Sequence, residues 1–460
     1  MARLMRCLYC GLLQDEPQGV KTCARCGGEL AFEQALPGPS YVRVQMELDQ
    51  IRAPSDQIVD RHLAITIQTP PEVPPEEAAP TASGRQPITF TAVLDVSGSM
   101  RGQKIESAKE AVRQAVLRLH EGDVFALVTF SSQVRTVLEP TVVTRRLRDQ
   151  VGEALQQVVA SGSTALCGGL EAGTAATVAH TRDTNLILLL SDGQANEGET
   201  DLEQIGRRAW QAQERKIITS TLGVGTDYNE ALMVEIATQG GGRFYHVLHA
   251  HQIVPYVAGE LGEASALAAR EATLRLTLPP GTGLYPLSAA YRVTEAGVSL
   301  GDVPVDTELE VILRLLLPAQ SAGARVPIEG RLAYRSPAGH DLEAPLNVVT
   351  VRYVPAAEFG RRDGAVAPVI GRVLDQMKAT GVLVSSRAAA TRGQAAAAEQ
   401  AQLSVAELRR YASLLGDEEA ERLADEQQTL YHAMAAAPAD SKSFVSSAFR
   451  RQRSTKDFDK

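Results

Sequence analysis

The chain has 460 residues, of which 44% are hydrophobic and 22% are charged, so it is long and apolar enough for two or three ordinary domains. Aspartate and glutamate (55) outnumber lysine and arginine (46), which gives a formal net charge of −9. This balance argues against a nucleic-acid partner, because phosphate contacts need concentrated positive charge. No apolar run is long enough for a signal peptide or a membrane-spanning helix, so we expect a soluble, cytoplasmic protein.

Two Cys-x-x-Cys pairs lie near the N-terminus, Cys7 with Cys10 and Cys23 with Cys26, and glycine follows each pair. Two such turns can place four thiolates at the corners of a tetrahedron, as in closed structural Zn²⁺ sites. The pattern resembles a zinc ribbon and predicts a zinc-binding domain over residues 1–36. A redox motif or paired disulfides are the alternatives, but a redox motif is usually a single pair on a βαβ unit.

Residues 37–69 alternate apolar and polar side chains, as at Leu63, Ile65 and Ile67. A period of two predicts half-buried strands. Residues 70–87 are rich in proline and glutamate, a composition that cannot build a core. We therefore expect strands that contribute to a β-sandwich, followed by a solvated linker.

Residues 88–268 alternate apolar strands with amphipathic helices. The strands at 124–130 and 186–190 are largely apolar, which is typical of parallel strands covered on both faces. The pattern predicts an α/β domain with a doubly wound parallel sheet.

A period of two returns in residues 269–355 and predicts a β-sandwich. Strands before and after the α/β domain could pair in that sandwich, which would make the α/β domain an insertion. Residues 356–436 show the apolar spacing of helices, and residues 437–460 are rich in serine and basic residues. We expect a helical region followed by a disordered basic tail.

Asp95, Ser97 and Ser99 occupy alternate positions directly after the apolar run 88–94, in the sequence Asp-Val-Ser-Gly-Ser-Met. One carboxylate and two hydroxyls are hard oxygen ligands, which suit Mg²⁺ or Mn²⁺ better than zinc or copper. A buried strand would deliver all three onto a loop that opens a helix. This stretch therefore predicts part of a site for a divalent cation.

Thr164 and Asp192 follow in two further segments, Gly-Ser-Thr-Ala before a helix and Ser-Asp-Gly after an apolar strand. Ligands of open α/β sheets bind at the carboxyl ends of the strands, where we expect these segments to converge. The alternative is that these residues cap helices. A cap would explain Asp95 or Ser99 singly, but not three converging segments.

This set of motifs is similar to the von Willebrand factor type A (vWA) domain with its metal-ion-dependent adhesion site. The resemblance covers about residues 88–268, and the flanking segments 102–105 and 240–245 resemble intracellular bacterial members. It implies that a partner carboxylate completes the shell of the ion and that the last helix, about 253–267, moves on binding. The ligands that it implies are the hydroxyls of Ser97, Ser99 and Thr164, with Asp95 and Asp192 binding directly or through water.

We expect a non-enzymatic, Mg²⁺-dependent interaction module or scaffold whose protein partner offers an acidic residue. One alternative that the resemblance implies is an adaptor subunit of an AAA+ (MoxR-like) ATPase machine. The chain has no G-x-x-x-x-G-K-[ST] loop, so it could not supply the ATPase itself. Another alternative is a signalling scaffold in which a kinase regulates the zinc ribbon or the serine-rich tail, with Ser441, Ser443, Ser446, Ser447 and Ser454. A hydrolase is not indicated, since no His-Glu-x-x-His motif, nucleophile elbow or carboxylate dyad stands out.

Other candidate residues have simpler interpretations. No histidine pairs with Cys167 in the sequence, so we expect a small buried residue rather than a nucleophile. His246, His249 and His251 could hold a transition metal, but a solvated loop at a strand end explains them as well. Glu77 is interpreted as a solvated linker residue rather than a catalytic acid.

Overall fold

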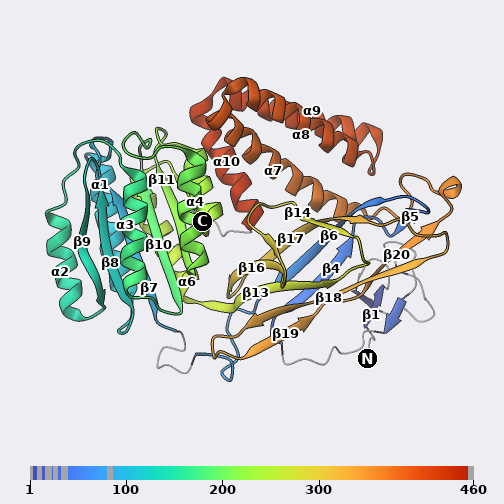
Figure 1. Ribbon diagram of the computed structural model, residues 1–460, viewed down its shortest axis with the longest axis horizontal. Coiled ribbons are helices and arrows are strands. Elements are labelled where there is room, and N and C mark those ends of the chain that lie inside the picture. The colour runs from blue at the N-terminus through green and yellow to red at the C-terminus, as the bar shows by residue number, and fades with distance from the viewer. Residues whose placement is uncertain are drawn as a thin grey trace.

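The structure is a computed structural model, and Figure 1 shows an α/β unit at one end, packed sheets at the other and a layer of helices above them. The described part of the chain comprises residues 4–7, 13–15, 23, 30–32, 40–79 and 86–453. Within it, no helix combines the length and the apolar character that crossing a membrane requires.

The α/β unit contains a sheet made of β7 (Ile88–Asp95), β8 (Val124–Phe130), β9 (Val134–Val142), β10 (Thr184–Ser191), β11 (Ile217–Val224) and β12 (Gly241–Val247). The strand order is β12-β11-β10-β7-β8-β9, and neighbours pair in parallel except β8 and β9. Every residue of β7, β8 and β10 is buried, because helices cover both faces of the sheet.

The helices of this unit are α1 (Gln103–Arg118), α2 (Arg145–Gln156), α3 (Leu166–Ala179), α4 (Leu202–Glu214), α5 (Glu230–Gln239) and α6 (Ile253–Ser265). One apolar core joins α1, α2 and α6 to one face of the sheet, and another joins α3, α4 and α5 to the other face. The predicted doubly wound α/β fold is confirmed. Close packing explains the glycines of α3, since a Cβ on Gly173 would lie 2.4 Å from the Val93 side chain.

A second unit, called the two-sheet unit here, contains β4 (Arg43–Leu48), β5 (Arg52–Pro54), β6 (Val59–Gln68), β13 (Leu267–Thr277), β14 (Gly283–Pro286), β15 (Arg292–Thr294), β16 (Gly297–Pro304), β17 (Glu308–Leu317), β18 (Arg325–Arg335), β19 (Asp341–Pro345) and β20 (Val349–Val354). Its sheets have the orders β14-β17-β6-β4 and β15-β16-β13-β18-β20-β5, with β19 beside β18. Apolar side chains from both sheets share one core. Since β6 pairs with β17 along its whole length, the α/β unit is inserted between strands that are neighbours in space.

Near the N-terminus, β1 (Leu4–Cys7), β2 (Leu13–Asp15) and β3 (Leu30–Phe32) form an antiparallel sheet in the order β2-β1-β3. Of the predicted zinc ligands, Cys7 ends β1 and Cys23 is buried. Cys10 and Cys26 lie outside the described residues. The zinc ribbon therefore stays a prediction.

Residues 70–79 do not form the solvated linker that their composition suggests. The Asp306 amide donates to the Pro70 carbonyl at 2.8 Å, and the Ala338 amide donates to the Glu77 carbonyl at 2.9 Å. The Glu77 carboxylate also lies 2.9 Å from His340 Nδ1. Backbone and side-chain hydrogen bonds to the loops of the two-sheet unit therefore hold this segment, although it buries few apolar residues.

The C-terminal helices are α7 (Ala367–Arg392), α8 (Gln394–Ala412), α9 (Asp417–Ala436) and α10 (Pro438–Arg453). The first three agree with the predicted helical region, but the prediction of a disordered tail over 437–460 is wrong for α10. Val445, Ala448 and Phe449 form a buried apolar stripe at helical spacing, which the many charged and serine residues around it conceal in the composition. The Phe449 ring packs edge-on against Phe244 of β12, at 6.0 Å between ring centres.

Candidate metal centre

The carboxyl ends of β7 and β10 place the two predicted acidic ligands side by side. The strands are parallel neighbours with Leu94 opposite Leu190, so Asp95 and Ser191 end them at the same edge of the sheet. The Ser191 hydroxyl donates to Asp95 Oδ2, and Asp192 is the next residue along the chain. This pairing explains how residues almost one hundred positions apart reach one site.

The loop after β7 folds back over Asp95 through a short helix, η1 (Gly98–Met100). The Ser97 amide donates to Asp95 Oδ1 at 2.8 Å, and the hydroxyls of Ser97 and Ser99 lie 3.1 Å apart. The Ser99 hydroxyl donates to Asp192 Oδ1 at 2.7 Å. The first and third predicted ligand segments are therefore in direct contact.

The segment that carries Thr164 is held against the loop after β7 by backbone hydrogen bonds. The Gly98 amide donates to the Gly162 carbonyl at 3.0 Å, and the Ser161 amide donates to the Val96 carbonyl at 2.7 Å. Backbone hydrogen bonds alone therefore hold the Thr164 segment beside the loop after β7.

Gly193 shows that the side chains of all three segments surround one space. A Cβ built on Gly193 would lie 3.1 Å from Thr164 Oγ1, 3.6 Å from Ser99 Oγ and 3.7 Å from Asp95 Oδ2. A side chain larger than hydrogen would fill the space between these oxygens. The structure thus brings together all five predicted ligands, and glycine keeps their centre open.

The electrostatics of this cluster favour a cation. Asp95 and Asp192 are both fully buried. Burial raises the pKa of the Asp95 carboxyl, hydrogen bonds from Ser191 and Ser97 act against this shift, and the charge of Asp192 adds to it. The Lys104 ammonium forms an ion pair with Asp192 Oδ2. Buried carboxylates need compensating positive charge, and this lysine supplies one unit of it.

The donor set fits Mg²⁺ or Mn²⁺. Two carboxylates and three hydroxyls are oxygen ligands, as hard divalent cations prefer, and neither a thiol nor an imidazole is among them. The acids alone are too few for a site, since no group of three or more His, Cys, Asp or Glu side chains suited to a metal occurs in the described residues. The hydroxyls would therefore have to take part in holding an ion.

Sequence reasoning missed the residues that support this cluster. The Asn196 side-chain oxygen accepts from the Thr164 amide at 2.8 Å and so positions the ligand loop. Nothing in the sequence around Asn196 signals this role. Lys104 and Gly193 both lie in conspicuous motifs, Gly-Gln-Lys-Ile and Ser-Asp-Gly, but their roles depend on contacts with other segments.

The residues set aside in the sequence have ordinary environments. Cys167 is buried, and burial raises the pKa of its thiol, which disfavours a reactive thiolate. His246 Nδ1 shares a hydrogen bond of 2.6 Å with the Tyr228 hydroxyl. The rings of His249 and His251 stack on each other with their centres 5.6 Å apart.

Residues 90–254 match the family model of the von Willebrand factor type A domain. The chain is 26% identical over 294 residues to the uncharacterized protein sll0103 of Synechocystis sp., a match that covers 60% of this chain and 69% of that protein. It is 26% identical over 242 residues to the uncharacterized protein YfbK of Escherichia coli, covering 50% of this chain and 42% of YfbK. Inter-alpha-trypsin inhibitor heavy chain H1 of Sus scrofa is 26% identical over 211 residues, which are 44% of this chain and 22% of that protein. The matches thus span less than half the length of the last two relatives.

Two solved structures share the fold over most of the chain. The ArnB paralog VWA2 from Sulfolobus acidocaldarius has a TM-score of 0.58 at 19% identity, covering 90% of this chain and 99% of that one. The von Willebrand factor type A protein from Catenulispora acidiphila has a TM-score of 0.58 at 17% identity, covering 82% and 91%. Because the aligned part of the chain is much longer than the α/β unit, the shared fold includes much of the rest of the chain.

Proposed function

Because this chain contains a vWA domain, and such domains generally mediate protein–protein interactions, we propose that it is a non-enzymatic, Mg²⁺-dependent binding module. The ion would be held by Asp95, Ser97, Ser99, Thr164 and Asp192, and a carboxylate of a protein partner would complete its coordination. The observation that carries this proposal is the convergence of oxygens from three segments around the space that Gly193 leaves open.

Charge explains why the partner should be acidic. Two carboxylates at most balance a divalent cation, and Lys104 already offsets part of the charge of Asp192. Mg²⁺ favours six oxygen ligands and readily keeps some positions for water or for another carboxylate. An acidic side chain of a partner could therefore replace water at the ion with a gain in electrostatic energy.

Metal binding can be tested first, with Mn²⁺ as a paramagnetic probe of the purified chain. We expect one bound Mn²⁺ that Mg²⁺ displaces, and we expect Thr164→Ala to weaken its affinity by about tenfold or more. Thr141→Ala is the matched control, because Thr141 lies on exposed β9 and its hydroxyl donates to the Glu139 carbonyl. If the Thr164→Ala variant bound Mn²⁺ as tightly as the wild-type chain does, the assignment of Thr164 as a metal ligand would be refuted.

Partner binding needs a second experiment. Proteins captured from native lysate with Mg²⁺ and lost in EDTA would be purified and tested singly against the chain. The proposal expects binding to fail in Asp95→Ala and to fail again when one Glu or Asp of the partner is changed to its amide. A partner that binds equally well in EDTA would contradict the proposal.

α10 does not decide the kinase-regulated alternative, because Ser443 and Ser447 are exposed on this helix. Ser441 and Ser446, by contrast, are each 6% exposed, so a kinase could reach these two serines only if α10 detached from the rest of the chain. In the described residues we find no feature that favours an AAA+ partner over another acidic protein. The lysate capture would detect such an ATPase directly.

We further propose that Cys7, Cys10, Cys23 and Cys26 bind one structural Zn²⁺. The spacing of the cysteines, the antiparallel strands β1 to β3 and the burial of Cys23 support this assignment. Four thiolates leave no open coordination position, so this zinc would stabilise the fold rather than catalyse a reaction. Elemental analysis should give one zinc per chain, lost in Cys26→Ser and kept in Cys167→Ala. A folded preparation without zinc would refute the site.

A further inference from the structure

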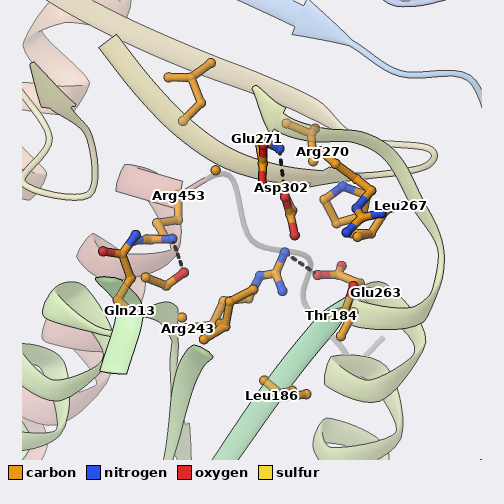
Figure 2. Close-up of a pocket in the computed structure, with 18 of the residues that line it drawn as sticks. Thr184, Leu186, Gln213, Arg243, Glu263, Leu267, Arg270, Glu271, Asp302 and Arg453 are labelled. Carbon is orange, nitrogen blue, oxygen red and sulfur yellow. Dashed lines mark hydrogen bonds and ion pairs between the residues drawn. The ribbon is translucent and has the colours of Figure 1, made fainter. Parts of the chain in front are cut away.

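A cavity of about 400 Å³ lies at the amino edge of the parallel sheet, opposite the candidate metal centre. The first residues of β10, β11 and β12 line it, together with strands of the two-sheet unit and the end of α10. Figure 2 shows charged side chains from all three parts of the fold directed into this space. Its size lies within the range of about 300–1,000 Å³ that is usual for small-molecule sites.

Arg453 and Arg292 line this cavity and have neutral hydrogen-bond partners. Arg453 Nη1 donates to the Gly241 carbonyl at 2.8 Å, and its buried Nε has no hydrogen-bond partner. Arg292 donates to the Gln239 carbonyl at 3.1 Å and to Gln213 Oε1 at 3.3 Å. Among the described residues, neither guanidinium has a carboxylate within ion-pair distance.

Burial makes this arrangement unfavourable without an anion. The pKa of Arg453 falls to about 10, chiefly because of burial; Tyr291 and the charge of Glu260 act against this shift, and the charges of Arg243 and Arg292 add to it. Tyr291 is 7% exposed and its hydroxyl has no hydrogen-bond partner. Buried cations and hydroxyls without acceptors are costly, and an anionic ligand would relieve both.

A carboxylate on the other side of the cavity adds a chemical restriction. Asp302 Oδ1 accepts from the Glu271 amide at 2.9 Å, and Figure 2 shows its carboxylate pointing into the cavity toward Arg243. Arg243 is already paired with Glu263 at 2.8 Å and with Glu260 at 3.4 Å. Burial raises the pKa of the Asp302 carboxyl, so its charged form is unfavourable in this cavity. When it is ionised, an anion beside it must offer it a proton, which phosphate can do and sulfate cannot.

We propose that this cavity binds phosphate, either free or as the phosphoryl group of a small metabolite. Arg453, Arg292 and the Tyr291 hydroxyl donate to the phosphate oxygens, and Asp302 accepts the proton that the phosphate carries. Charge-assisted bonds of this kind, above all from guanidinium groups, are the usual means of phosphate recognition. Because the ligand would touch the α/β unit, the two-sheet unit and α10, it would stabilise their arrangement. This site is independent of the metal centre.

Calorimetry on the full chain in a buffer without phosphate tests the proposal, with inorganic phosphate, glycerol 3-phosphate and sulfate as ligands. We expect one bound phosphate or phosphate ester per chain, unaffected by EDTA, and much weaker binding of sulfate. Arg453→Gln should weaken phosphate binding by about tenfold or more, which corresponds to about 1.4 kcal/mol. Arg451→Gln is the matched control, because Arg451 lies on the same helix but pairs with Asp375 at 2.9 Å.

The remaining variant tests selectivity. Asp302→Asn should reduce the difference in affinity between phosphate and sulfate. Thermal melting should show that Arg453→Gln, Arg451→Gln and Asp302→Asn all remain folded. Tighter binding of the ester than of inorganic phosphate would identify a phosphorylated metabolite as the ligand, and the reverse order would identify free phosphate. Unchanged affinity in Arg453→Gln, equal binding of sulfate by the wild-type chain, or no binding at millimolar phosphate would overturn the proposal.

Discussion

Substituting Gly193 tests the candidate metal centre with a single methyl group. The Cβ of Gly193→Ala would stand 3.1 Å from Thr164 Oγ1, which requires a shift of a few tenths of an ångström, and within 3.7 Å of Asp95 Oδ2. Overpacking of this size costs about 1–3 kcal/mol, so we expect the fold to survive. An ion bound at the proposed site would depend on those oxygens more strictly, and disturbing the surroundings of metal ligands typically weakens metal affinity about 10–100-fold.

The assay is thermal melting with and without Mg²⁺. At a concentration of about 100 times Kd, Mg²⁺ stabilises the wild-type chain by about 2.7 kcal/mol, and a tenfold loss of affinity in the variant leaves about 1.4 kcal/mol. With about 2–4 °C of Tm per kcal/mol for a domain of this size, the Mg²⁺-induced rise should fall from about 5–11 °C to about half of that.

The control for this experiment is Gly152→Ala on α2, where an added Cβ meets no atom within 4 Å. It should keep the full Mg²⁺ response, because it adds the same methyl group far from the ligands. An equal Mg²⁺ response in Gly193→Ala and in the wild-type chain would refute the convergence of the three segments on one ion.

Two further predictions concern charge. Lys104→Met should tighten Mg²⁺ binding, since the ammonium paired with Asp192 repels an incoming cation. Calorimetry measures the Mg²⁺ affinity of the variant and of the wild-type chain. Weaker binding in the variant would show that Lys104 instead holds Asp192 in place. Burial, helped by the charge of Lys442 and opposed by that of Glu230, lowers the pKa of His246 from 6.5 to about 4. Between these values the unfolded chain binds a proton that the folded chain does not, so stability falls as the pH falls through this window. His246→Gln should lose less stability there in urea unfolding, and an unchanged pH profile would contradict the shift.

The sequence was most informative where local pattern and sheet geometry agree. Asp95 and Asp192 each follow an apolar strand, and the carboxyl ends of parallel strands meet at one edge, so their proximity follows from strand assignment alone. Thr164 is less constrained by pattern. Its place depends on backbone hydrogen bonds between loops, which only the three-dimensional arrangement reveals.

Elements that depend on tertiary contacts could not be predicted. β9 is mostly exposed and pairs as an antiparallel edge strand, so it has no apolar run to indicate it. α10 has a buried stripe, but serines and arginines dominate its composition. Lys442 on that helix donates to the Tyr228 carbonyl at 2.6 Å, a contact between residues 214 positions apart. Composition describes the average polarity of a segment, whereas the packing of α10 against the rest of the chain depends on a few of its side chains.

The insertion of the α/β unit also has a kinetic consequence. Asp60 on β6 and Arg314 on β17 form an ion pair of 2.8 Å across 254 positions of sequence, so their strands can pair only after the inserted unit has been synthesised. Closing a flexible loop of that length is entropically unfavourable, whereas a folded insert brings its two ends together in advance. We therefore expect the α/β unit to fold first and the two-sheet unit to follow. A mutation that delays the insert would then slow the maturation of the whole chain, even where the mutated residue touches neither sheet of the two-sheet unit.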